Sequence, residues 1–196
     1  MKLLQLQKRT MALAGVLMTI YLILHMLTNL SFFSEDNFSQ FYEWYNGGIV
    51  RWLVLIAIVV SLFIHIKAAI RIRIANAKAR TIAYKKHDKL HIPASLVTVS
   101  IIFLFSFIVI HILQTLSFDS KAVYDETVQL FQSVWIVLFY LAGLFVLMMH
   151  LSHSLANVLQ TLGKTSALCH RLVLASTLLL TGGFAVIPLY IYCVMP

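Results

Sequence analysis

The chain has 196 residues, of which 61% are hydrophobic and only 11% are charged, and its mean hydropathy is +0.90. A soluble domain of this length does not need so much apolar surface, so the composition excludes a water-soluble enzyme. The formal net charge is +8, from 15 basic and 7 acidic residues.

Long uncharged runs predict a polytopic membrane protein, because a membrane-spanning helix needs roughly 20 apolar residues. Four runs exceed that length, and a fifth span is predicted where the long stems of flanking Lys and Arg residues can reach the interfaces. The predicted fold is all-α in a single domain over 1–196. Its five transmembrane helices are predicted at about 11–33, 49–74, 92–118, 130–160 and 170–195. The start, MKLLQLQKRTMALAG, shows no A-x-A-like site, so we expect no cleaved signal peptide.

Charge predicts the orientation, because basic residues accumulate on the cytoplasmic side of a membrane. Three Lys or Arg residues precede the first predicted span, eight lie around the loop after the second, and two lie before the fifth. Six of the seven acids fall on the other side. We therefore expect the N-terminus inside and the C-terminus outside, with a basic inner face that contacts anionic lipid or a cytoplasmic partner and needs no nucleic acid to explain it.

The two cysteines do not supply the chemistry. Cys169 and Cys193 are expected near opposite ends of the last span, too far apart for a disulfide. No C-x-x-C or C-x-x-C-H sequence occurs, so iron–sulfur, thiol redox and c-type haem sites are not indicated.

Histidines inside the spans are the strongest functional signal, because an imidazole in a membrane is costly and usually functional. At 1.5 Å per residue, His25 and His111 both fall in the outer half of the bilayer. His65 and His150 both fall in the inner half.

The chain also carries an internal duplication. The pattern H-x-L-x-x-L-S-F occurs at 25–32 and again at 111–118, and the next paired histidines follow after 40 residues (His65) and 39 residues (His150). The first and second spans are therefore predicted to repeat as the third and fourth, related by an axis along the membrane normal. Equivalent histidines would face each other at equal depth in a four-helix bundle, with the fifth helix beside it.

Two imidazoles at one depth suit the two axial positions of a haem iron. His25 with His111 would hold an outer haem, and His65 with His150 an inner haem. Such ligation leaves no open position on iron, so it favours electron transfer over oxygen chemistry. His153, one turn beyond His150, is predicted to lie beside an iron-binding histidine or a haem propionate without binding the iron itself. Three further histidines, His87, His91 and His170, are assigned no role.

These residues resemble the di-haem cytochrome b membrane anchors of succinate dehydrogenases and fumarate reductases, in their single-polypeptide five-helix form. The similarity covers nearly the whole chain and rests on MALAGVLMTIYLILHMLTNL, LFIHIKAAIRIRIANAKARTIAY, FIVIHILQTLSF and MMHLSHSLANVLQTLG. The resemblance implies two haem b groups, with His25 and His111 on the distal iron and His65 and His150 on the proximal iron. The chain would be the non-catalytic, quinone-reacting subunit of the enzyme.

The resemblance also implies partners. A flavoprotein and an iron–sulfur subunit would dock on the cytoplasmic face of a bacterial inner membrane, and electrons would pass between them and a quinone, more specifically menaquinone. For the quinone, the outer segment offers Glu43 and Arg51, where a carboxylate can relay protons. Some fumarate reductases of this type have a glutamate two residues before the fourth ligand, where this chain has Met148.

Two other interpretations are weighed. One is a di-haem anchor of another oxidoreductase, such as nitrate reductase, formate dehydrogenase or hydrogenase, which the duplicated histidine pattern disfavours. The other is a transporter that uses membrane histidines to bind a metal ion or relay protons. The central spans carry no Asp or Glu, which disfavours a transporter.

Overall fold

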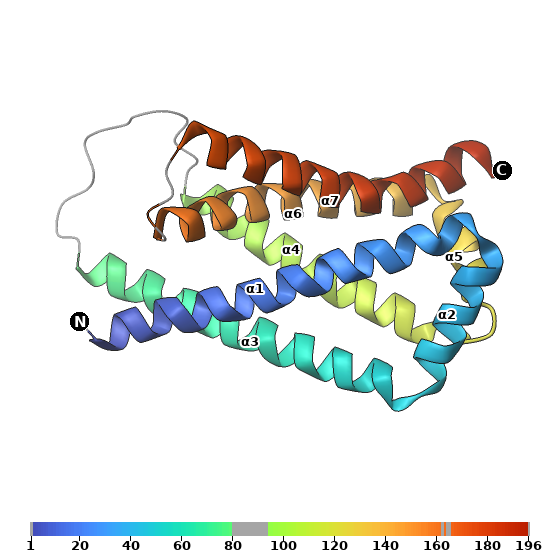
Figure 1. Ribbon diagram of the computed structural model, residues 1–196, viewed down its shortest axis with the longest axis horizontal. Helices are drawn as coiled ribbons and strands as arrows, with labels where there is room; N and C mark the ends of the chain where they lie inside the picture. The colour runs from blue at the N-terminus through green and yellow to red at the C-terminus, as the bar shows by residue number, and fades with distance from the viewer. Residues whose placement is uncertain (1, 80–93, 162, 164–165, 196) are drawn as a thin grey trace. The chain divides into compact units, whose positions relative to one another are not determined.

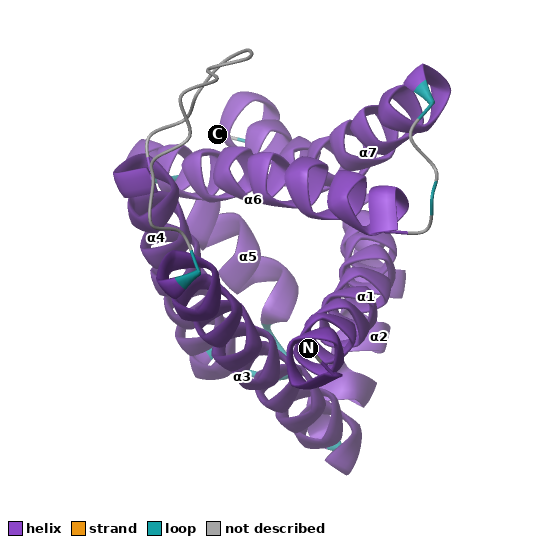
Figure 2. Ribbon diagram, turned by 90° about the vertical axis from the view of Figure 1, so that its left-hand side faces the viewer, coloured by secondary structure: helices purple, strands orange, loops and turns teal. Residues whose placement is uncertain are grey.

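The computed structural model describes residues 2–79, 94–161, 163 and 166–195, and within these ranges the regular structure is helical throughout (Figures 1 and 2). In chain order the elements are α1 (Lys2–Leu30), the 3₁₀ helix η1 (Ser31–Phe33), α2 (Glu35–Gly47), α3 (Ile49–Lys78), α4 (Ala94–Ser117), α5 (Val123–Phe131), α6 (Val134–Thr161) and α7 (Ala167–Val194). Residues 92 and 93 of the predicted third span lie outside the described ranges.

Five of these helices are long and apolar enough to cross a membrane, which confirms the prediction of a multi-pass, all-helical chain. They cover Gln5–Phe33, Ile49–Lys78, Thr98–Ser117, Val134–Leu159 and Ala167–Val194. Each observed span overlaps its predicted one, with ends that differ by up to six residues, and at the fourth the predicted start at 130 falls inside α5. The helix breaks at Gln132 and Ser133 before α6 begins.

Two short helices, α2 and α5, are additions to the predicted fold. Each has two acids in its first turn, Glu35 and Asp36 in α2, and Asp125 and Glu126 in α5. Acidic side chains in that position are favourable because the N-terminal end of a helix carries a partial positive charge. The apolar residues of α2 and α5 then pack inward, and Phe38, Val123 and Phe131 are buried.

The chain divides into two compact units. Unit 1 comprises residues 1–24 and 48–93, and unit 2 comprises residues 25–47 and 94–196. In unit 1, the first part of α1 and the whole of α3 run in opposite directions (Figure 1). The single domain predicted over 1–196 stays a prediction.

Unit 2 is built around α6, which packs on both α4 and α7. Its core combines residues of these helices with residues of η1, α2 and α5: Phe32, Phe38, Leu104, Phe107, Val123, Phe131, Val137, Tyr140, Ile187 and Ile191. Phe32 stacks on Tyr124 with ring centroids 4.8 Å apart, which joins η1 to α5. The core therefore lies where the short helices meet the ends of the long ones.

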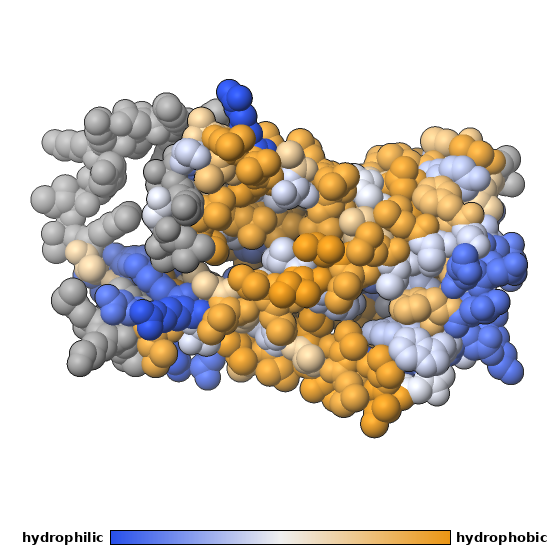
Figure 3. Space-filling view, viewed as in Figure 1, coloured by the Kyte–Doolittle hydropathy of each residue, from blue (hydrophilic) through white to orange (hydrophobic). Residues whose placement is uncertain are grey.

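Apolar side chains cover the outside of the long helices. Figure 3 shows hydrophobic residues along the middle of the helices and hydrophilic residues near their ends. Leu13, Leu179 and Trp135 are each more than 70% exposed. A surface of this kind is stable in contact with lipid, and in water it would be an aggregation hazard.

Several predicted features fall at or beyond the limits of the described residues. The exposed basic side chains of α3 lie toward its C-terminal end: Lys67, Arg71, Arg73 and Lys78. The remaining basic loop positions, with His87 and His91, lie outside the described residues: Arg80, Lys85, Lys86, Lys89 and Lys164. Cys169 and Cys193 are both free thiols on α7, as predicted.

Candidate functional site

The predicted outer pair of histidines comes together in unit 2. His25 lies near the C-terminal end of α1 and His111 near that of α4. Their ring centroids are 5.9 Å apart and their planes are inclined by 54°. Both side chains are half-buried. Metal–imidazole bonds are about 2 Å long for zinc, and at that length two imidazoles on opposite sides of one ion would have ring centroids roughly 6 Å apart.

Aromatic side chains from two other positions border this pair. Phe184 of α7 lies 5.4 Å from the His25 ring, and Phe107, one turn before His111 on α4, stacks on the His111 ring at 6.2 Å with an interplanar angle of 15°. The pair therefore lies between apolar rings, which suit a flat, apolar prosthetic group.

Two glycines allow the helices to approach closely here. A Cβ atom at Gly143 of α6 would lie 2.5 Å from Cδ2 of Phe107, and a Cβ atom at Gly183 of α7 would lie 2.7 Å from Sδ of Met26. Small residues at such contacts let a side chain of the facing helix lie directly against the backbone. The glycines bring α6 toward His111 and α7 toward His25.

A hydrogen-bonded chain holds the His111 ring. The Tyr140 hydroxyl donates to Oε1 of Gln114 at 2.8 Å, and Nδ1 of His111 lies 3.2 Å from the same hydroxyl oxygen. Because the Tyr140 proton is used on Gln114, its oxygen accepts from Nδ1–H of His111. Nε2 of His111 is then the nitrogen that carries the lone pair.

His65 has a comparable arrangement in unit 1. Its Nδ1 lies 3.1 Å from the main-chain oxygen of Met11 on α1, and a carbonyl oxygen only accepts, so Nδ1 donates. Gly15, one turn after Met11, would place a Cβ atom 3.4 Å from Cε1 of His65. The lone pair of His65 is therefore also on Nε2.

The other predicted haem residues lie on α6. His150 is half-buried and belongs to unit 2, whereas His65 belongs to unit 1, and their pairing stays a prediction. His153 is exposed, and its Nε2 accepts from the Asn157 amide at 3.0 Å, one turn further along the helix.

The two residues predicted to contact quinone lie in different units. Glu43 is exposed on α2. Arg51, in the first turn of α3, stacks its guanidinium 5.0 Å from the Trp52 ring centroid. Its Nε is buried and has no hydrogen-bond partner among the described residues. Their joint role in quinone binding stays a prediction.

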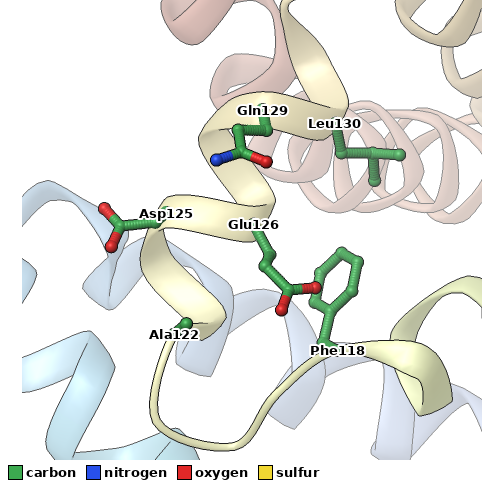
Figure 4. A pocket seen from close by; sticks show the side chains of 6 residues that line it. All are labelled: Phe118, Ala122, Asp125, Glu126, Gln129 and Leu130. Atoms are coloured by element: carbon green, nitrogen blue, oxygen red, sulfur yellow. The ribbon is translucent and has the colours of Figure 1, made fainter.

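An open groove of 580 Å³ lies at the α5 end of unit 2, lined by Phe118, Ala122, Asp125, Glu126, Gln129 and Leu130. Figure 4 shows the Glu126 carboxylate beside the Phe118 ring, while Asp125 points away from both. Oε1 of Glu126 accepts from the main-chain N–H of Asp119 at 2.9 Å. The groove is thus bordered by a carboxylate whose orientation is fixed by the preceding loop.

Within the part of the chain that the structure describes, no three His, Cys, Asp or Glu side chains gather as a metal site. In both His111 and His65 the Nδ1 atom is bound to an oxygen, which is the usual arrangement when Nε2 ligates a metal. His65 and His111 therefore each leave Nε2 available to a metal ion such as haem iron.

Tyr140 and Gln114 are the site residues that the sequence interpretation missed. Each is a polar group in a predicted apolar span, and Gln114 follows His111 by three residues, which places the two on one face of α4. That spacing was the available signal for Gln114. Tyr140 lies on another helix and had no comparable signal.

Comparison with known proteins adds no family: no protein-family model, no curated protein and no solved structure matches this chain.

Proposed function

We propose that the chain is the cytochrome b membrane anchor of a succinate:quinone oxidoreductase, that is, of a succinate dehydrogenase or fumarate reductase. In this role it carries electrons between a cytoplasmic iron–sulfur subunit and a membrane quinone, more specifically menaquinone, and is itself the non-catalytic subunit. The observation that carries the proposal is the His25–His111 pair, at 5.9 Å between ring centroids, with Nδ1 of His111 bound to Tyr140.

Two haem b groups are the proposed cofactors. His25 and His111 would hold the outer one, and His65 and His150 the inner one, with His153 as a neighbour of the inner haem. When bound, haem iron with two imidazole ligands supplies reversible one-electron transfer. The chain's own residues orient the imidazoles: Met11 through its carbonyl at His65, and Tyr140 at His111.

The five apolar helices and the exposed basic end of α3 support the rest of the proposal. The chain would lie in a bacterial inner membrane with its N-terminus in the cytoplasm and its C-terminus outside. The flavoprotein and iron–sulfur subunits would dock on the basic face. Glu43 and Arg51 are the proposed quinone contacts.

Haem content per polypeptide tests the cofactor assignment. The chain, co-expressed with its partner subunits and purified in detergent, should give two b haems by pyridine haemochrome and by reduced-minus-oxidised spectra. His25→Ala and His65→Ala should each lose at least one haem. His170→Ala, an exposed histidine on α7, is the matched control and should keep both. Correctly inserted wild-type protein without haem would overturn the proposal and leave the metal or proton transporter as the leading interpretation.

The choice of partner enzyme has its own test. In the assembled complex, succinate should reduce the haems, and fumarate should reoxidise them. Reduction by formate or hydrogen, or reoxidation by nitrate, without any response to succinate or fumarate would instead assign the chain to another respiratory oxidoreductase.

A further inference from the structure

Tyr140 is the polar group that stands out in the apolar core of unit 2. It is 7% exposed and lies in the second turn of α6, in a segment predicted to cross the membrane. Burying a hydroxyl is costly unless it is hydrogen-bonded. The Tyr140 hydroxyl makes two hydrogen bonds: its O–H donates to Gln114 at 2.8 Å, and its oxygen accepts from His111 at 3.2 Å.

The direction of these two bonds determines the tautomer of His111. Oε1 of Gln114 can only accept, so the single proton of Tyr140 goes to Gln114. The phenolic oxygen can then only accept from His111, so Nδ1 of His111 carries the proton. Without Gln114 the phenol proton would no longer be held away from Nδ1, and the Nδ1–H···O bond of His111 would be weakened.

Packing holds Tyr140 in this position. Its ring meets Phe131 edge-on at 4.8 Å and Phe107 edge-on at 5.3 Å. Phe107 in turn stacks on His111 and lies against Gly143, which follows Tyr140 by three residues on α6. The close α4–α6 contact therefore places the hydroxyl at His111, and few other positions are open to it.

We propose that Tyr140 and Gln114 are positioning residues of the outer centre: they fix His111 in the tautomer that ligates through Nε2, and they lower the reduction potential of the iron it binds. The inference rests on the proposed function. The physical reason is that an Nδ1–H···O bond raises the electron donation of the imidazole, which favours ferric over ferrous iron. Removing the hydroxyl removes that donation and also makes the surroundings less polar, and both effects raise the potential.

The test uses three variants of the assembled complex. Tyr140→Phe removes the hydroxyl and keeps the ring. Gln114→Met keeps the side-chain length and removes the acceptor. Tyr192→Phe removes a phenolic hydroxyl from an exposed position on α7 and is the matched control. Redox titration and electron paramagnetic resonance of the low-spin haems are measured for each.

Tyr140→Phe and Gln114→Met should each raise the potential of one haem, the same haem in both, and change its resonance signature, while the other haem is unaltered. A tenfold change in the ferric-to-ferrous ratio corresponds to about 59 mV for a one-electron couple. We expect a shift of roughly this size, because loss of the hydrogen-bond partner of a metal-bound histidine commonly changes metal affinity or activity by about 10–100-fold. Tyr192→Phe should leave both haems unchanged.

The outcomes separate the inference from the function it rests on. Wild-type complex without haem contradicts the proposed function. Two haems in the wild type with both potentials unchanged in Tyr140→Phe and Gln114→Met would overturn the inference and leave the function standing. If neither variant accumulates in the membrane, redox-induced infrared difference spectra of the wild type decide, because a tyrosine C–O band should shift with the outer haem and its absence would overturn the inference.

Discussion

The same histidine geometry is reached by different means in the two units. In unit 1, Nδ1 of His65 donates to a main-chain carbonyl, that of Met11, at 3.1 Å. In unit 2, Nδ1 of His111 donates to a side-chain hydroxyl, that of Tyr140, at 3.2 Å. Both arrangements leave the lone pair on Nε2, which is the nitrogen a metal would use.

The difference shows where each site can be changed. The main-chain carbonyl of a helical residue accepts the N–H of the residue four positions later, which for Met11 is Gly15. A histidine from another helix reaches the Met11 carbonyl only if the side chain at position 15 is small. In unit 2 the acceptor is itself a side chain, and an aromatic core holds it in place. Unit 1 has no such core among its described residues, of which only Ser61, Ala68 and Ile72 are buried. The first site therefore depends on a small residue at position 15, and the second on particular side chains.

The largest expected effect that separates the two sites comes from Gly15→Leu. A Cβ atom at position 15 already lies 3.4 Å from His65, so a leucine side chain would occupy the approach to the Met11 carbonyl. We expect the proposed inner haem to bind about 10–100-fold more weakly, because histidines that lose their outer-shell partner lose affinity of that order. The outer haem should remain, as measured by haem content and redox titration.

Gly15→Ala is the control for this change. At 3.4 Å its Cβ atom makes an ordinary van der Waals contact with Cε1 of His65, so both haems should be retained. Equal haem loss in Gly15→Ala and Gly15→Leu, or none in either, would contradict the role given to the open carbonyl.

In unit 2 the same glycine-to-alanine change should be harmful. A Cβ atom at Gly143 would lie 2.5 Å from the Phe107 ring, a distance that side chains do not adopt, and that ring is confined between His111 and Tyr140. Overpacking of this kind costs about 1–3 kcal/mol. Thermal unfolding in detergent should show the loss of stability, and the resonance signature of the outer haem should change while that of the inner haem does not. A Gly143→Ala protein as stable as Gly15→Ala would show that α4 and α6 can separate freely.

A smaller effect is expected at the other glycine contact of unit 2. Gly183→Ala would place a Cβ atom 2.7 Å from Sδ of Met26, but a methionine side chain is flexible and can move away. We expect a loss below about 1 kcal/mol. The adjacent Gly182→Ala, which has nothing within 4 Å, is the matched control and should leave the unfolding temperature unchanged. A large loss in Gly183→Ala would show that Met26 is held rigidly beside His25.

The sequence predicted the features that depend on one helix at a time. The five spans follow from apolar runs, because a helix that contacts lipid must be apolar around its circumference, and the structure bears them out. The histidine depths, which rest on the rise per residue, stay a prediction. Both short helices were missed, because α2 and α5 mix acids with aromatic residues and their apolar faces are stabilised by packing on Phe32 and Tyr124.

Features that depend on how two helices are rotated against each other could not be predicted in the same way. Whether Tyr140 faces His111 is decided by the close approach at Gly143, which no spacing within α4 or α6 specifies. The partner of His65 is a main-chain carbonyl, which every residue has, so the only trace in the sequence is the glycine one turn later.

The smallest effect at neutral pH concerns a second hydroxyl of unit 2, that of Tyr42 on α2. It donates to Oδ1 of Asn29 at 2.6 Å, and burial raises the pKa of Tyr42 from 10.0 to about 12. A pKa that is higher in the folded than in the unfolded state contributes stability that is fully present below pH 10 and is lost as the pH rises from 10 to 12. Stability should therefore fall across that range in the wild type, and the Tyr42 phenolate should appear near pH 12 in ultraviolet absorbance.

Tyr42→Phe should be less stable than the wild type at pH 7, because the Asn29 oxygen loses its donor, and the difference should narrow toward pH 12. A gap that is independent of pH would mean that the Tyr42 hydroxyl is solvated in the folded protein.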